Sequence, residues 1–273
     1  MTDTASTNRQ GSGAPALRFM VRKAQEQRPL IIGLTVIAVL WQISTYFLPP
    51  IITPPLQEIG SAIWIIFTDP KMLVHLLTTG TRVLVALIAS FIVGAVIGLL
   101  MGTFDGVREY VKPLLHFVQG VPALSWVIFA VIWFANVEFR IGFVLLIVTM
   151  PAFALYIESA VRSVNLDLVH LGQAFRASRL QRFKMIVIPA IIPQVIGAWT
   201  VNLGQGVRVA MVAELIGSNV GVGFQLLNSQ AVFDMAGAIA WTLSLVLLLS
   251  VFQGTISFAE SRLLAWRPKG ETA

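Results

Sequence analysis

Residues 80–103 read GTRVLVALIASFIVGAVIGLLMGT, and this one stretch decides the class of fold. From Val83 to Met101 no charged residue interrupts it. About 20 apolar residues in a helix are enough to cross the ~30 Å hydrocarbon core of a bilayer. The stretch therefore predicts a transmembrane helix that carries one ionisable residue, Arg82, in its first turn.

Five further apolar runs predict that the whole chain is an all-α, polytopic membrane protein with about six transmembrane helices. The composition agrees, because 56% of the 273 residues are hydrophobic and only 12% are charged. The charged fraction is about half of that in soluble domains. The six predicted spans are 30–48, 80–103, 114–135, 141–160, 186–206 and 235–258.

The positions of the basic residues predict how these spans are oriented. Fifteen of the 19 lysines and arginines fall in the two terminal tails and in the loops 104–113 and 161–185. Three fall on the alternate side, at Lys71, Arg140 and Arg208. Basic residues accumulate in cytoplasmic loops, so both termini are predicted to be cytoplasmic, which requires an even number of spans. The net charge of +6 is thereby explained by topology, without a nucleic-acid partner.

This reading divides the chain into four parts. A cytoplasmic tail, 1–29, precedes the first span, 30–48; the main transmembrane domain is 72–259, and a cytoplasmic tail follows at 260–273. The bulky, proline-containing segment after the first span favours a retained helix over a cleaved signal peptide. Segment 49–72 has too many prolines to cross the membrane, so Ile59–Phe67 is predicted as a short helix at the outer surface.

Glycine and proline mark positions of close packing or of helix distortion. Gly94, Gly98 and Gly102 are spaced four residues apart and share one helix face, which lets another helix approach closely. That helix could belong to the same subunit or to a second one. Pro122 and Pro151 interrupt or border spans, and such breaks either line a cavity or only adjust packing.

The ionisable residues do not form a catalytic or metal-binding pattern. Three scattered histidines lack metal-ligand spacing, there is no cysteine, and there is no phosphate-binding loop of the GxxxxGK[ST] type. We therefore predict no catalytic residue, no metal and no cofactor. Charged residues near span ends either anchor and pair or serve a function. They are Arg82, Glu158 with Arg162 one turn later, and Arg208 and Glu214 just past the fifth span.

The loop 161–185 contains the most informative segment. Read as a helix over 166–183, it places Leu168, Leu171 and Phe175 on one stripe and most polar residues elsewhere. Such a helix could lie on the anionic inner leaflet or dock into a groove of a partner protein.

The same segment resembles the EAA loop of ABC importer permeases. That pattern is Glu-Ala-Ala, three residues, Gly, nine residues, and Ile-x-Leu-Pro. In this chain other residues stand at the first positions, Arg176 stands where glycine is usual, and the final positions match. The residues at and beside the motif are His170, Leu171, Gly172, Phe175, Arg176, Ala177, Ser178, Arg179, Ile186, Ile188 and Pro189.

The resemblance extends over about residues 30–268 and is closest to the permeases of nitrate, sulfonate and taurine importers. Further similar stretches are Thr81–Val83, Gly94–Gly98, Val121–Trp126, Trp133–Phe134, Val207–Leu215, Gly221–Gly223 and Arg262–Arg267. The resemblance implies that the chain is a type I importer permease in a bacterial inner membrane. Such a permease pairs with a second copy of itself or with a related subunit. Separate cytoplasmic ATPase subunits hydrolyse ATP in such importers, and an extracytoplasmic binding protein delivers the cargo.

The resemblance also implies roles for particular residues. Leu171 and Phe175 would dock into the ATPase. Closure of the ATPase subunits on ATP would then move this loop and, through it, the transmembrane helices. The third to fifth spans would line the pathway for a small anion such as a sulfonate, nitrate or a related organic acid. The pathway candidates are Pro122, Trp126, Arg208 and Glu214. Two other classes remain as alternatives: a secondary transporter or channel, and a membrane enzyme, which would require clustered His, Asp or Glu.

Overall fold

The computed structural model describes residues 14–264, which are helical with connecting turns and contain no strand. The chain forms two units, Met1–Glu58 and Ile59–Ala273, and each is described separately below. The helices are α1 (Ala14–Ser44), α2 (Leu56–Thr68), α3 (Pro70–Thr103), α4 (Asp105–Gly120), α5 (Ala123–Trp133), α6 (Val137–Arg162), α7 (Leu166–Ala174), α8 (Arg179–Arg182), α9 (Ile188–Gly217), α10 (Val222–Ala231) and α11 (Met235–Leu263).

Four helical stretches of the described chain are long and apolar enough to cross a membrane. They are α3, α6, the continuous stretch Arg179–Gly217 and α11. A fifth crossing results if α4 and α5 are counted as one broken span. The predicted all-α, polytopic membrane class is thereby confirmed, although the first predicted span appears here as a shorter apolar stretch, Ile31–Ser44.

The third predicted span, 114–135, is not one straight helix. The chain bends by 90° between α4 and α5. Pro122 stands immediately before α5 as its N-cap residue, and Val121 is extended. Proline has no amide hydrogen to donate and disfavours a helical conformation in the residue before it, so the helix ends here.

The centre of the second unit is the contact between α3 and α6, which run parallel to each other. A Cβ atom added to Gly94 would lie 2.7 Å from the Cβ of Phe153, and one added to Gly98 would lie 2.6 Å from the carbonyl oxygen of Ala154. At Gly102 the added atom would lie 2.7 Å from Val161. The three glycines are therefore used for close helix packing within this chain.

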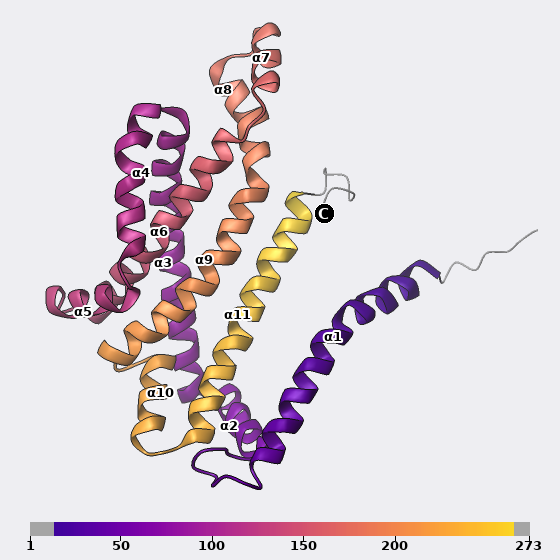
Figure 1. The fold of residues 1–273 in the computed structure, drawn as a ribbon, viewed down its shortest axis with the longest axis vertical. Coiled ribbons are helices and arrows are strands. Elements are labelled where there is room, and N and C mark those ends of the chain that lie inside the picture. The colour runs from indigo at the N-terminus through magenta and orange to yellow at the C-terminus, as the bar shows by residue number, and fades with distance from the viewer. Residues whose placement is uncertain (1–13, 265–273) are drawn as a thin grey trace, which may run out of the picture. The chain divides into compact units, whose positions relative to one another are not determined.

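The remaining helices extend this pair into a bundle. α9 packs antiparallel to α3, with Gly206 against Leu87, and α11 packs beside α3, with Leu248 near Gly80. In Figure 1, α7 and α8 lie at one end of this bundle and α10 lies at the other. We call these the α7 end and the α10 end.

The first unit is closed by side-chain hydrogen bonds across its proline-rich turn. The indole N–H of Trp41 donates to the carbonyl oxygen of Pro54 over 3.0 Å, and Gln42 Oε1 accepts from the amide of Leu56 over 3.3 Å. Helix α2 has only 13 residues, which agrees with the short helix predicted over Ile59–Phe67.

Candidate functional site

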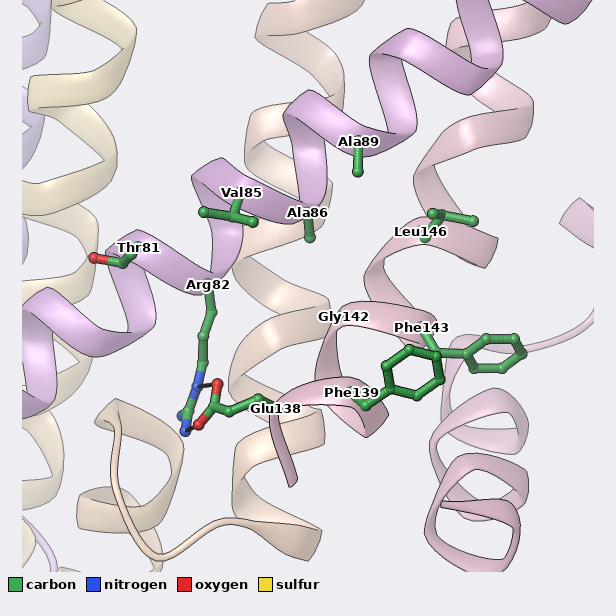
Figure 2. Close-up of a pocket in the computed structure, with 10 residues that line it drawn as sticks. All are labelled: Thr81, Arg82, Val85, Ala86, Ala89, Glu138, Phe139, Gly142, Phe143 and Leu146. Carbon is green, nitrogen blue, oxygen red and sulfur yellow. Dashed lines mark hydrogen bonds and ion pairs between the residues drawn. The ribbon is translucent and has the colours of Figure 1, made fainter. Parts of the chain in front are cut away.

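A buried arginine joins three helices near the α10 end. Arg82 on α3 donates through Nη1 to Glu214 Oε1 of α9 over 2.7 Å. It also donates through Nε to Glu138 Oε2 of α6 over 2.8 Å, and through Nη2 to Glu138 Oε1, which makes this second contact bidentate. Figure 2 shows the two side chains reaching toward each other from α3 and α6. The guanidinium geometry suits such paired acceptors.

Helix α3 also holds the turn between α9 and α10 through three side chains on one face. Arg82 Nη1 donates to the carbonyl oxygen of Val220 over 2.7 Å. The hydroxyl of Thr79 accepts from the amide of Val222 over 2.9 Å, and Nδ1 of His75 accepts from the amide of Gly221 over 3.1 Å. These three residues follow at i, i+4 and i+7, so a single helix face satisfies consecutive backbone groups of the turn.

The carboxylate of Glu214 completes this network. Its side chain is fully buried. Oε2 accepts from the Thr79 hydroxyl over 2.8 Å and from the amide of Gly223 over 3.1 Å. Gly221 has φ +127°, and a side chain there would collide with this carboxylate. Each oxygen of a buried charge therefore has its donors, as a buried carboxylate requires.

A second charged cluster lies near the α7 end, between α4 and α6. Glu158 is 3% exposed and accepts from Arg108 Nε over 2.6 Å and from Lys112 Nζ over 3.0 Å. Arg162 is 3.9 Å from Glu158 and makes its shorter contact, 2.8 Å, with Asp105. The expected i, i+4 pair exists, but residues of α4 supply the closer partners of Glu158.

The predicted single helix over 166–183 is broken, which corrects that prediction. Helix α7 ends at Ala174, and Arg176 has φ +56°, in the left-handed region. The amide of Ala177 donates to the carbonyl oxygen of Gly172, and that of Arg176 donates to Gln173. These two hydrogen bonds form a Schellman motif, a helix ending whose left-handed position usually holds glycine.

A new helical start follows directly. Ser178 and Gln181 form a reciprocal capping box at the beginning of α8, and a π-helical turn over Phe183–Val187 leads into α9. The predicted motif residues thus lie on a folded helix–turn–helix connector. Its exposed members are His170, Leu171, Phe175, Arg176, Ser178, Arg179 and Ile188, and its half-buried members are Gly172, Ala177, Ile186 and Pro189.

The connector also carries a shallow surface pocket of about 410 Å³. It lies between α7 and the start of α9 and is lined by Leu168, Leu171, Phe175, Met185 and Ile186, among others. The side chain of Phe175 is 79% exposed and that of Met185 is 76% exposed. Large apolar side chains gathered at an exposed pocket are typical of a binding surface.

The four pathway candidates lie in different surroundings. Pro122 is exposed at the break between α4 and α5. Trp126 lies on α5, is half-buried against the core, and has a buried indole N–H without a partner among the described residues. Arg208 and Glu214 lie within α9 and not beyond its end, because the helix continues to Gly217. Glu214 is buried, whereas Arg208 is exposed.

The histidines are spread over different surroundings. His75 lies on α3 and accepts from the amide of Gly221 in the turn described above, and His116 and His170 are exposed. Among residues 14–264 no group of three or more histidines and carboxylates is placed to hold a metal ion. Sequence reasoning left Arg82 either as an anchoring or pairing residue or as a functional one, and it did not connect Arg82 with Glu138 or Glu214. The signal in the sequence that could have indicated a partner for Arg82 was the position of this charge, directly before the long uncharged stretch that begins at Val83.

Comparison with known proteins agrees with this architecture. The chain is 27% identical over 196 residues to the taurine transport system permease protein TauC of Escherichia coli (strain K12), covering 70% of this chain and 71% of that protein. It is 25% identical over 252 residues to the formylaminopyrimidine transport permease protein ThiX of Halalkalibacterium halodurans, covering 92% of this chain and all of that protein.

A solved structure of the MetNI methionine ABC transporter, in an inward-facing conformation, contains a chain with the same fold. It aligns with a TM-score of 0.55 and 18% identity, covering 74% of this chain and 100% of that chain. Residues 90–264 match the family described as "Binding-protein-dependent transport system inner membrane component". This match spans more than half of the sequence and includes α4 to α11. The chain is therefore a multi-pass membrane protein that belongs to the family of inner membrane components of binding-protein-dependent transport systems.

Proposed function

We propose that this chain is the permease subunit of an ATP-driven importer and forms the pathway for a small anion. The observation that carries the proposal is the exposed apolar surface of the connector between α6 and α9. Separate ATPase subunits would bind this surface, and an extracytoplasmic binding protein would deliver cargo at the α10 end. The taurine, sulfonate and nitrate permeases among the relatives support the anionic class of cargo.

The connector is suited to transmit a movement of a bound ATPase. Its Schellman motif and capping box fix the positions of Leu171 and Phe175 relative to α9. Burial of the Phe175 ring in a groove of the ATPase would stabilise the complex by about 1.5–3 kcal/mol. Arg179, which is exposed at the start of α8, would contribute to a polar rim.

The basic residues support a cytoplasmic position for this connector. Arg176, Arg179 and Lys184 lie on it, and Arg108 and Lys112 lie at the same end of the bundle. Basic residues concentrate on the cytoplasmic side of inner-membrane proteins. We infer that the α7 end and both termini face the cytoplasm and that the α10 end faces outward.

Replacing Phe175 with Asp tests the docking surface. We expect the variant to insert and fold normally but to lose co-purification with the ATPase and cargo-stimulated ATP hydrolysis. A matched control is Val232→Asp, which places the same carboxylate on an apolar residue, 72% exposed, just after α10. The control should still co-purify with the ATPase. Normal transport by the Phe175 variant would end the proposal.

Arg208 is the residue that we assign to the anion pathway. It is exposed in the middle of α9 and has no ion pair or hydrogen bond among the described residues. An unpaired charge on a lipid-facing surface is unfavourable, and such residues usually face a water-filled path. Gly197 and Gly204 lie on the same stripe; the space beside Gly197 is open, and the atom nearest to Gly204 is Nη1 of Arg208 itself, 4.0 Å from an added Cβ. Glu214 is buried, so we assign it to the Arg82 network instead.

Two substitutions at Arg208 separate charge from shape. Arg208→Gln should lower uptake of taurine or nitrate, whichever the transporter accepts, by at least about tenfold, because one charge-assisted contact contributes about 1.5–3 kcal/mol. Arg208→Lys should retain most of the uptake. Equal uptake by wild type and Arg208→Gln would remove Arg208 from the pathway while leaving the ATPase proposal intact.

We also propose that two permease subunits enclose the pathway. The exposed Arg208 stripe of one chain would then face a second copy across water instead of facing lipid. Chemical cross-linking of the purified complex tests whether that second subunit is identical. Capture of a different permease chain would replace the homodimer with a heterodimer.

A further inference from the structure

The Arg82 network carries a surplus negative charge that is accessible from outside. One guanidinium is shared by two carboxylates, so the group of Arg82, Glu138 and Glu214 has a formal net charge of −1 when both carboxylates are ionised. The side chains of Arg82 and Glu214 are 8% and 0% exposed, whereas that of Glu138 is 64% exposed. The surplus charge is therefore presented by Glu138.

Two surface pockets meet at this carboxylate. One has a volume of about 410 Å³ and runs between α3 and α6 along Val85, Ala89 and Leu146, as Figure 2 shows. The other, about 330 Å³, runs in the opposite direction along Val74 and Leu77. Thr81, Arg82 and Glu138 line both pockets. Together they form one groove along α3 from Val74 to Ala89, roughly 22 Å long at 1.5 Å per helical residue.

The sequence places the middle of this groove at the edge of the hydrocarbon. Residues 83–101 are free of charge and are long enough, at roughly 28 Å, to span the apolar core of a bilayer. The arm along Val85 and Ala89 therefore lies among acyl chains, and the arm along Val74 lies toward the headgroups. Val85 is 62% exposed, so the groove opens sideways.

We propose that this groove binds a phospholipid with a primary ammonium headgroup, namely phosphatidylethanolamine. The ammonium would donate hydrogen bonds to the exposed carboxylate of Glu138, and one acyl chain would lie along Val85, Ala89 and Leu146. An apolar trough with a charged group at the interfacial level has the chemistry of a lipid site. The net charge of −1 disfavours anionic lipids, and a quaternary ammonium has no N–H to donate. The site is independent of the ATPase and of the cargo.

Native mass spectrometry of the full-length permease tests the headgroup. The purified protein is exposed to equimolar phosphatidylethanolamine, phosphatidylcholine and phosphatidylglycerol with identical acyl chains. We expect phosphatidylethanolamine to be retained about fivefold more than either competitor, the ratio given by about 1 kcal/mol of preference. Equal retention of the three lipids would overturn the headgroup assignment.

Two variants test the groove. Glu138→Gln should abolish the headgroup preference, and Glu109→Gln, an exposed carboxylate on α4, should leave it unchanged. Gly142→Leu should reduce retention of all three lipids, because a side chain added there meets open space in the groove and no protein atom within 4 Å. Gly254→Leu on α11, also in open space, is its control. Unchanged retention in Gly142→Leu would contradict the site.

A second copy of the chain is the competing occupant. Because the chain has no cysteine, a single Val85→Cys substitution gives a specific probe. Efficient oxidative disulfide formation between the cysteines introduced at position 85 of two subunits in membranes would show that another permease chain fills the groove. The lipid proposal expects no such cross-link and predicts that added phosphatidylethanolamine slows modification of the cysteine by a membrane-permeant maleimide.

Discussion

Arg82 Nη1 lies 2.7 Å from Glu214 Oε1, although 132 residues separate the two positions in the chain. Both side chains are almost inaccessible, so each charge depends on the other. The contact joins the first half of α3 to the last turn of α9. Through Val220 and Gly223, the same two residues also hold the turn that leads into α10.

We predict that Arg82→Gln destabilises the folded protein by about 3–5 kcal/mol, because it leaves the buried Glu214 carboxylate unpaired. The double variant Arg82→Gln/Glu214→Gln should be less destabilised than Arg82→Gln alone, since the unpaired charge is removed. Thermal unfolding in detergent measures both.

Glu138→Gln is the matched control for this pair. Its carboxylate contacts the same guanidinium but is 64% exposed, and exposed ion pairs contribute about 0–1 kcal/mol. A loss of stability in Glu138→Gln as large as that in Arg82→Gln would contradict the burial argument.

We predict that Arg176→Gly stabilises the connector by about 1 kcal/mol, because a left-handed conformation disfavours residues with a Cβ by about that amount. Amide hydrogen exchange over 172–178 should slow. The same substitution at Arg179, which begins α8 in a helical conformation, should have the opposite effect. A change of the same sign in both variants would show that backbone conformation is not the cause.

The connector shows where sequence reasoning failed. The apolar spacing of Leu168, Leu171 and Phe175 fits a continuous helix, so one helix over 166–183 was predicted. The break depends on Arg176 in a conformation that arginine rarely adopts, and no local pattern marks it. The resemblance did contain the signal, because glycine is usual at that position in the motif.

The long apolar helices were predictable, since hydrophobic length alone determines them. The helix that packs against Gly94, Gly98 and Gly102 could not be predicted, because the residues on one helix face do not determine which other helix covers that face. The network of Arg82 with Glu138 and Glu214 was missed for a similar reason. Arg82 and Glu214 were noted as separate charges near span ends, Glu138 was not singled out, and only the packing of α3, α6 and α9 brings the three together.

We predict that Gly98→Ala destabilises the bundle by about 1–3 kcal/mol, the usual range for overpacking. The added methyl group would lie 2.6 Å from the carbonyl oxygen of Ala154 and 2.8 Å from the Cβ of Ile157. Gly254→Ala, in open space on α11, should instead stabilise its helix by about 0.5–1 kcal/mol. Thermal unfolding compares the two, and a stabilising effect at Gly98 would contradict the close approach of α3 and α6.

We predict that Glu158→Gln destabilises the contact between α4 and α6 by about 1.5–3 kcal/mol, the range for hydrogen bonds to charged groups. Glu158 is 3% exposed and accepts from both Arg108 and Lys112, so its loss leaves adjacent cations without their shared partner. Asp105→Asn is the control, since Asp105 is 84% exposed and its pair with Arg162 should contribute at most about 1 kcal/mol. Raising the salt concentration should weaken the Asp105 effect more than the Glu158 effect, because screening acts mainly on exposed charges. Equal effects of the two substitutions in low salt would mean that burial does not strengthen the Glu158 cluster.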